Sequence, residues 1–303
     1  MRELPVPTFA LSPSHRVHAA MPRGSLHCRS QAETPKIEHS GEREDTAQII
    51  SGRSKRPVRA MWAQHLDEVR EAQRLRHSIF AGEMGAQLPV HARSDLAAHD
   101  TDRFDDYCEH LIVRDGDDGP IVGTYRLLTP AQAKRVGGLY SDDEFDLSPL
   151  AHLRPHMVEL GRSCVHADYR HGGVILALWS ALFEFMQRNQ LHSMVGCASI
   201  PMLHNGMMSG DVAASVWKQL QPTHMAVEPL RVNPLLPLPI EQLDSTLAVE
   251  PPPLIKGYLR LGARILGAPA WDPDFNTADL PMLLRTEDIA TRYRRHFVSE
   301  LTA

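Results

Sequence analysis

The chain has 303 residues, of which 43% are hydrophobic and 23% charged, a composition typical of a globular protein with one large or two small domains. Its net charge of −5 gives no reason to expect nucleic-acid binding, and there is no run of about 20 apolar residues that would predict a transmembrane helix. The four cysteines are widely spaced and match no metal-binding pattern, so we expect no metal site and a reducing, cytoplasmic location.

Residues 1–58 are rich in Ser, Pro, Arg, Glu and His and show no sustained hydrophobic periodicity. We therefore expect residues 1–60 to be a disordered N-terminal extension and residues 61–303 to form the folded domain. Within it, the core is expected over about 61–221 and a further C-terminal part over about 222–303. An alternative interpretation places the natural start of the protein at Met61.

The remaining pattern predicts a mixed α/β layer structure around one sheet. Helices are expected at 68–80, 174–189, 213–220, 254–266 and 287–297, and strands at 109–114, 121–128, 157–165, 194–200 and 279–284. Residues 86–106 are Asp-rich and predict a loop, as does the acidic segment 137–149. Residues 222–253 contain eight prolines and predict extended chain.

The most informative segment is residues 158–175, where an apolar strand pattern ends in two glycines and a helix begins at once. A helix N-terminus after a glycine turn presents unpaired N–H groups, which suit the phosphate of a pantetheine arm. We therefore expect an acyl-donor site there. It is made of Val165, Arg170, Gly172, Gly173 and Val174. A plain strand-to-helix turn is the alternative.

The chain resembles the GNAT-like acyltransferases that use acyl carrier protein, in particular the ornithine N-alpha-acyltransferases that make lyso-ornithine lipid. The acyl-homoserine-lactone synthases are more distantly similar. The resemblance rests on residues 102–105 (DRFD), 123–128 (GTYRLL), 159–162 (ELGR), 252–262 (PPLIKGYLRLG) and 274–279 (DFNTAD). It implies a GNAT-like α/β (α+β) fold, with a central mixed sheet flanked by helices and a C-terminal extension. Residues 170–173 (RHGG) are a shortened version of the loop with which ordinary GNAT acetyltransferases bind the pyrophosphate of coenzyme A. The shorter loop favours a carrier-protein-bound pantetheine, which has a single phosphate.

The resemblance also implies an active site around Glu159 and Arg162. Glu159 would accept a proton from the attacking amine, and Arg162 would bind the substrate carboxylate or orient Glu159. Three residues apart on a strand, the two side chains face opposite ways unless a bulge at Gly161 intervenes. A structural ion pair between them is the alternative.

An amine-substrate pocket is implied around Arg126, a guanidinium on an otherwise apolar strand, which needs a partner such as Asp102 or Asp105. Arg76 and Phe80 match the same family pattern. A solvated loop edge with a surface arginine is the alternative for these acids and Arg126.

Lys256, Arg260 and Arg264 recur every four residues and predict a cationic stripe on one helix face, for docking an acidic carrier protein or anionic lipid. A solvated helix face explains it equally well.

The resemblance implies an enzyme that moves a fatty acyl group, with or without a 3-hydroxyl, from acyl carrier protein to the α-amine of ornithine, giving lyso-ornithine lipid. No cofactor is expected besides the phosphopantetheine thioester. The expected partners are the carrier protein and the amino acid ornithine, and a peripheral contact with the membrane surface is a further expectation. Another N-acyl amino acid synthase or a signal synthase is the alternative enzyme. A peripheral membrane or carrier-binding module without catalysis is the non-enzymatic alternative.

Overall fold

The computed structural model describes residues 57–88, 98–204, 206–291 and 293. Nearly all of the expected N-terminal extension lies outside these residues, as do residues 292 and 294–297 of the helix expected at 287–297. The first strand, β1, spans Val58–Trp62 and pairs with β2, so residues 58–60 belong to the sheet rather than to the extension.

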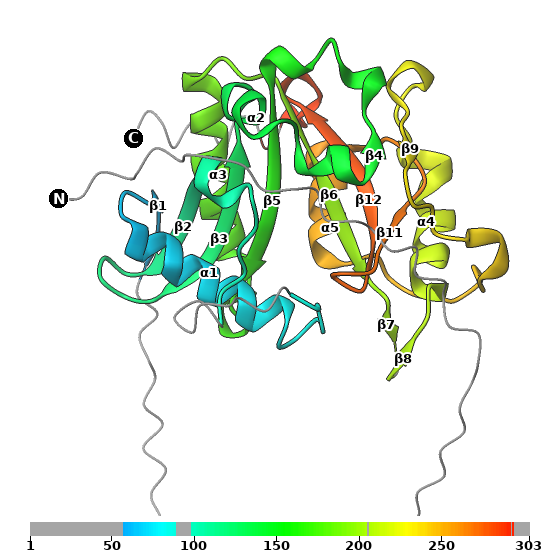
Figure 1. The fold of residues 1–303 in the computed structure, drawn as a ribbon, viewed down its shortest axis with the longest axis horizontal. Coiled ribbons are helices and arrows are strands. Elements are labelled where there is room, and N and C mark those ends of the chain that lie inside the picture. The colour runs from blue at the N-terminus through cyan, green and yellow to red at the C-terminus, as the bar shows by residue number, and fades with distance from the viewer. Residues whose placement is uncertain (1–56, 89–97, 205, 292, 294–303) are drawn as a thin grey trace, which may run out of the picture. The chain divides into compact units, whose positions relative to one another are not determined.

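One mixed sheet organises the domain, with the strand order β1-β2-β3-β5-β6-β12-β10 and β11 also paired to β12 (Figure 1). Its other strands are β2 (Glu109–Asp115), β3 (Ile121–Leu128), β5 (Met157–Val165), β6 (Ser193–Pro201), β10 (Arg264–Ile265), β11 (Ala270–Asp272) and β12 (Thr277–Arg285). The pair β5–β6 is parallel and the other pairs are antiparallel. The expected central mixed sheet is therefore confirmed.

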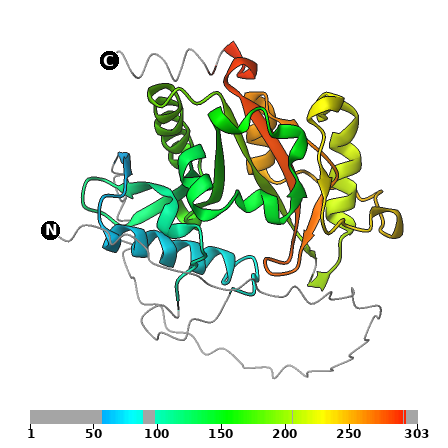
Figure 2. The same cartoon turned by 45° about the horizontal axis from the view of Figure 1, so that its top comes forward.

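Helices cover both faces of this sheet (Figure 2). They are α1 (Leu66–Phe80), α2 (Pro130–Val136), α3 (Gly173–Arg188), α4 (Asp211–His224) and α5 (Pro253–Leu261). Helix α1 lies on one face of β2 and β3, and α3 lies on the other. Gly123 of β3 permits the close approach of α3, because a Cβ there would lie 2.4 Å from Cγ1 of Val174.

Shorter elements occupy the connections between these helices and strands. The short strands are β4 (Phe145–Asp146), β7 (Leu203–His204), β8 (Met207–Met208) and β9 (Asn233–Pro234). The 3-10 helices are Asp105–Tyr107, Tyr140–Asp143, Ser148–Leu150, Arg154–His156, Ala167–Tyr169, Glu228–Leu230, Ile240–Gln242 and Thr286–Asp288. No helix in the described ranges has the length and hydropathy needed to cross a membrane.

The prediction of one helix over 254–266 is wrong. Helix α5 ends at Leu261, because Gly262 takes a left-handed conformation with φ +118°, which does not continue the right-handed helix. A side chain at Gly262 would also collide with the carbonyl oxygen of Asp288, at 2.2 Å. The chain then reverses into β10, so Arg264 lies on a strand.

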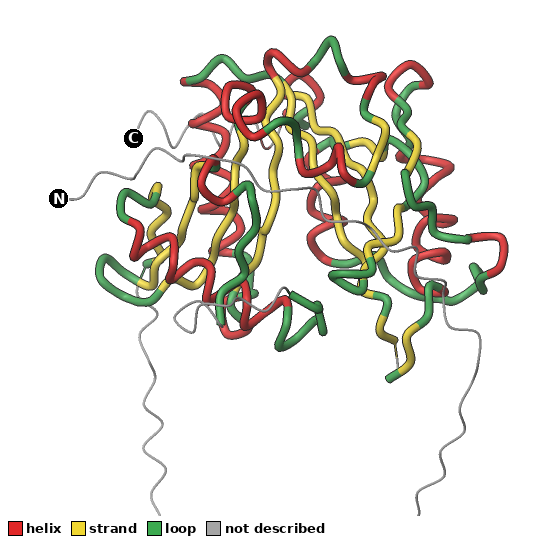
Figure 3. The backbone as a smooth tube through the Cα atoms, in the orientation of Figure 1, coloured by secondary structure: helices red, strands yellow, loops and turns green. Residues whose placement is uncertain are grey.

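The central feature of the sheet is the separation of β5 from β6, which Figure 3 shows as two strands that meet at one end and diverge. They pair over Met157–Glu159 of β5 and no further. A β-bulge follows at once, because Gly161 pairs with Arg126 of β3 whereas Cys164 pairs with Thr124. The divergence leaves a gap in the ladder beyond Glu159, where backbone groups of β5 have no strand partner on the β6 side.

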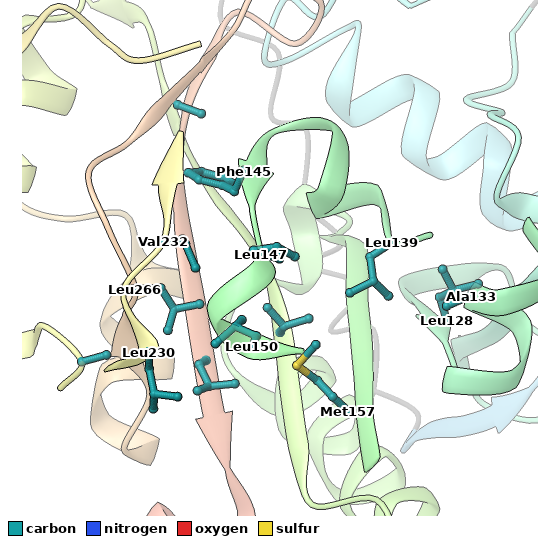
Figure 4. Packing of buried hydrophobic residues seen from close by; sticks show 14 of the residues in the cluster. Leu128, Ala133, Leu139, Phe145, Leu147, Leu150, Met157, Leu230, Val232 and Leu266 are labelled. Carbon is teal, nitrogen blue, oxygen red and sulfur yellow. The ribbon is translucent and has the colours of Figure 1, made fainter. Parts of the chain in front are cut away.

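Strands from both halves of the chain share a hydrophobic core (Figure 4). Phe145, Leu150 and Met157 pack there with Leu266 and Leu283, each 3% exposed or less. Burying each such side chain contributes about 1.5–3 kcal/mol. The C-terminal part therefore completes the sheet and its core instead of forming a separate layer.

Candidate active site

A cavity of about 820 Å³ opens where β5 and β6 diverge. Its walls come from the second half of β5, from β6, β11 and β12, and from the starts of α3 and α5. A cleft of this size with a mainly apolar wall and a few convergent polar groups is typical of a small-molecule site.

The cavity passes through the sheet from one face to the other. Side chains alternate along β3, so Tyr125 and Arg126 point to opposite faces, yet both line the cavity. On the α1 side of the sheet, Arg126 lies near Glu159, whereas Tyr125 shares a hydrogen bond with Tyr258 of α5 on the other side. Two reactants can therefore enter from opposite faces and meet between β5 and β6.

Glu159 lines this cavity and is 4% exposed. Its carboxylate accepts hydrogen bonds from the N–H groups of Tyr140 (2.6 Å) and Ser141 (2.7 Å) and from the Ser141 hydroxyl (2.6 Å). Burial raises the pKa of Glu159 above its ordinary value, although these bonds oppose the rise. A carboxylate has about four acceptor positions, so this one keeps room for a further proton or hydrogen bond.

The bulge expected at Gly161 is present, and it brings Glu159 and Arg162 to the same cavity. The residue that carries it is Arg162, whose φ of +52° is uncommon for a side chain other than glycine. The described residues show no ion pair between Glu159 and Arg162. Its Nη2 bonds instead to Asp102 at 3.0 Å, and its Nε lies 3.2 Å from Asp100.

Arg126 has the partners that its place on an apolar strand requires. Its Nη1 lies 2.6 Å from Asp102 and 3.2 Å from Asp105. Arg76 joins the same network through Asp100 (2.7 Å) and Asp105 (2.8 Å). Burial alone would raise the pKa values of Asp102 and Asp105, but the neighbouring guanidinium charges outweigh it and lower both.

Only some of the residues expected to bind the amine substrate reach the cavity. Phe80 and Arg126 line it. Arg76, Asp102 and Asp105 lie behind this wall and are not among the described lining residues, and Arg76 is fully buried. These three therefore do not line the cavity as expected. With Asp100, Arg126 and Arg162 they form a network of three arginines and three aspartates that holds Arg126 and the segment before β2 in place.

At the other end of the cavity, the expected acyl-donor residues cluster around the start of α3. Gly172 caps the helix with φ +104° and, with Val165 and Arg170, lines the cavity. Gly173 and Val174 supply backbone N–H groups in the first helical turn, while the Val174 side chain is buried against β3. Arg170 donates from Nε to the Val165 carbonyl (2.9 Å).

The expected cationic stripe divides between two elements. Lys256 and Arg260 lie on α5, and Arg260 also lines the cavity. The prediction that Arg264 belongs to this helix face is wrong, because Arg264 lies on β10 and donates a hydrogen bond to the Thr223 carbonyl at 3.2 Å. Lys256 lies 3.3 Å from Glu250, at an exposed position.

Sequence reasoning missed four polar residues of the site: Asp100, Ser141, Asp272 and Asp279. The last two are buried carboxylates that line the cavity opposite β5. Asp279 carries the same signal that singled out Arg126, a charged side chain on an apolar strand, and could have been found. Asp100 lies in a loop and Ser141 in a single 3-10 turn, where no periodicity distinguishes a buried polar group from a solvated one.

Residues 75–180 match the family described as the acetyltransferase (GNAT) domain. The chain is 35% identical over 248 residues to the L-ornithine N(alpha)-acyltransferase of Brucella abortus (strain 2308), covering 77% of this chain and 85% of that protein. It is 34% identical over 254 residues to the protein of the same name from Agrobacterium fabrum, covering 77% and 82%. This chain belongs to the L-ornithine N(alpha)-acyltransferase family.

Membership of this family confirms the resemblance drawn from the sequence blocks and establishes a GNAT-type acyltransferase. Among solved structures, the chain is similar to the CoA-dependent acyl-homoserine lactone synthase BjaI, at 17% identity and a TM-score of 0.47, covering 81% of this chain and 89% of that one. It is also similar to FeeM, an N-acyl amino acid synthase from uncultured soil microbes, at 11% identity and a TM-score of 0.47, covering 76% and 92%.

Proposed function

We propose that this protein transfers a 3-hydroxy fatty acyl group from acyl carrier protein to the α-amine of ornithine, forming lyso-ornithine lipid. The observation that carries the proposal is a cavity through the sheet with a buried carboxylate, Glu159, at its narrow end. The relatives named L-ornithine N(alpha)-acyltransferase support ornithine as the amine.

In this reaction Glu159 acts as the proton acceptor. The neutral α-amine attacks the thioester carbonyl, the new C–N bond forms, and the amine gives its proton to Glu159, directly or through water. The tetrahedral intermediate then collapses, the C–S bond breaks, and the pantetheine thiolate takes up the proton. The environment supports this role, because burial holds the pKa of Glu159 above its ordinary value.

The unpaired part of β5 is placed to stabilise the oxyanion. Beyond Glu159, the strand has no partner on its β6 side, so backbone N–H groups there face the cavity. Preorganised N–H donors aimed at developing charge commonly contribute several kcal/mol, about 3–4 kcal/mol for one donor. No metal or redox cofactor enters any step of the proposed reaction.

The acyl donor enters beside α3 and α5. Gly172 and the first N–H groups of α3 suit a single phosphate, which is what a carrier-protein-bound pantetheine presents. Exposed Arg260 at the cavity wall and Lys256 nearby suit the acidic surface of the carrier protein. We propose that the protein works in the cytoplasm, in peripheral contact with the membrane that receives its lipid product.

The test is lipid mass spectrometry on a host that lacks ornithine lipids and expresses the full chain, with Glu159→Gln as the matched control. We expect a new N-acyl-ornithine in the first strain and a strongly reduced amount in the second. N-acyl derivatives of other amino acids alone would keep the reaction and change the amine. No N-acyl product from a folded chain would favour a binding module without catalysis.

A further inference from the structure

Two buried carboxylates line the cavity on the wall opposite β5. Asp272, at the end of β11, is 4% exposed, and Asp279, on β12, is 3% exposed. They lie on neighbouring strands, since Asp272 pairs with Thr277. Both side chains face the cavity, which joins them to the site already described.

Neither carboxylate has a cationic partner among the described residues. Asp279 accepts a hydrogen bond from the Thr277 hydroxyl at 2.9 Å. Asp272 accepts from the N–H groups of Asp274 (2.9 Å) and Phe275 (3.1 Å), and from the Tyr140 hydroxyl at 3.3 Å. These are neutral donors, and no ion pair within 4.0 Å joins either acid to a described Lys, Arg or His.

The nearest guanidinium, that of Arg162, is already committed elsewhere. It pairs with Asp100 and Asp102, and its charge lies over the rings of Tyr140 (4.9 Å) and Phe275 (4.4 Å). The arginines of that network are matched by an equal number of aspartates. Three carboxylates of the cavity, Glu159, Asp272 and Asp279, are therefore left without an ion-pair partner among the described residues.

An uncompensated buried carboxylate is costly to the fold. Burial raises the pKa of Asp279 to about 7 and also raises that of Asp272, so ionising either carboxyl group costs free energy in the folded protein. A chain that only needed to pack this wall would use an amide or an apolar side chain. A charge kept at such a position indicates a ligand that supplies the opposite charge.

We propose that Asp272 and Asp279 form the subsite that binds the terminal ammonium group of a diamino acid and so selects the amine substrate. This inference rests on the proposed function, in which Glu159 faces the α-amine at the narrow end of the cavity. A diamino acid differs from other amino acids by a second ammonium group, which is the group that these two carboxylates would bind.

The strand register places the three acids on one face of the sheet. Along β6, Val195 lies opposite Glu159 and Ser199 lies opposite Asp279. These two positions are an even number of residues apart on one strand, so Glu159 and Asp279 project from the same face, and Asp272, opposite Thr277, shares it. A diamino acid in the cavity can therefore direct its α-amine toward Glu159 and its terminal ammonium toward Asp272 and Asp279.

The experiment compares ornithine with norvaline, which has the same carbon chain without the terminal amine. With purified full-length protein and acyl carrier protein carrying a 3-hydroxyacyl group, kcat and KM are measured for both amino acids in the wild type, Asp279→Asn and Asp272→Asn. We expect the wild type to prefer ornithine. Each variant should lose at least tenfold of that preference in kcat/KM, chiefly through a higher KM for ornithine.

Asp274→Asn is the matched control, because this exposed aspartate lies in the same segment and is not one of the described cavity residues. It should keep the wild-type preference. Thermal unfolding and circular dichroism of each variant establish that it is folded, and the preference is a ratio that partial unfolding does not change.

The outcomes separate the two ideas. A wild type that prefers ornithine, with variants that lose activity toward both amino acids equally, would overturn the subsite and leave the proposed function standing. Unchanged kinetics in both variants would do the same. A wild type that acylates lysine or another diamino acid better than ornithine supports the subsite and corrects the proposed amine. A wild type that prefers norvaline overturns both.

Discussion

Two sets of three carboxylates lie in or near the same cavity, and their environments are opposite. The first set stands in the loop before β2 and consists of Asp100, Asp102 and Asp105. Guanidinium groups on α1, β3 and β5 pair with each of them. The second set consists of Glu159, Asp272 and Asp279. Its hydrogen bonds come from neutral N–H and O–H donors of the described residues.

The pKa directions follow from this difference. Arginine charges lower the pKa values of Asp102 and Asp105 despite burial, whereas burial prevails at Glu159, Asp272 and Asp279 and raises theirs. Asp105 is as deeply buried as Glu159, Asp272 and Asp279, so the counter-charge and not the burial decides the direction. The first set is an internally neutral scaffold, whereas the second has no counter-charge among the described residues and can bind a cationic ligand. Four changes test this division.

The largest effect is expected at Glu159. Glu159→Gln removes the proton acceptor and should lower kcat at least about hundredfold. It also turns an amide NH₂ toward the N–H donors of Tyr140 and Ser141, which should cost about 1–3 kcal/mol of unfolding free energy. Steady-state kinetics and urea denaturation measure the two losses.

Ser141→Ala sharpens the same test. It removes one hydrogen bond that favours the charged form of Glu159, so the pKa of Glu159 should rise further. The acidic limb of the pH profile of kcat/KM should then move to higher pH. An unmoved limb would show that another group controls it.

In the first set, Arg76→Ala should destabilise the protein by about 3–5 kcal/mol, because it leaves Asp100 and Asp105 buried without their counter-charge. Arg103→Ala is the control: its pair with Asp143 is exposed, and its loss should cost less than about 1 kcal/mol. Equal values from urea denaturation would contradict the scaffold role.

In the second set, Asp279→Asn should stabilise the protein at high pH. The folded pKa of Asp279 is about 7 against an ordinary 3.8. Its ionisation therefore costs no stability below pH 3.8, and the cost grows as the pH rises from 3.8 to 7 and then levels off. At about 1.4 kcal/mol for each pH unit, the variant should gain on the order of 2–4 kcal/mol at pH 8. The gain should vanish near pH 4. A gain independent of pH in thermal unfolding would contradict this origin.

The smallest effect concerns the carrier protein. Lys256→Glu with Arg260→Glu should raise KM for acyl carrier protein about threefold to tenfold at low salt, with kcat nearly unchanged. The effect should shrink at 0.5 M salt, since screening weakens exposed charges. Arg188→Glu, at the far end of α3, is the control. An interaction insensitive to both salt and charge reversal would remove α5 as the docking surface.

Local pattern was sufficient for the regular elements near the site. Strand β5 has the predicted bounds, and α1 and α3 begin within two residues of the predicted positions, because hydrophobic periodicity and glycine punctuation are local properties. The pattern failed at residues 254–266, where apolar spacing continued past Gly262 although the backbone reverses there.

The electrostatic division was decided by tertiary structure alone. Family blocks named Glu159, Arg126 and Arg162, but whether a carboxylate has a counter-charge depends on contacts between residues far apart in the chain. The pair Arg162–Asp102 spans 60 residues, and Tyr140 reaches Asp272 across 132. Charge compensation depends on distances in space. Only the folded sheet therefore shows which carboxylates are paired with arginines and which face the cavity without a cationic partner among the described residues.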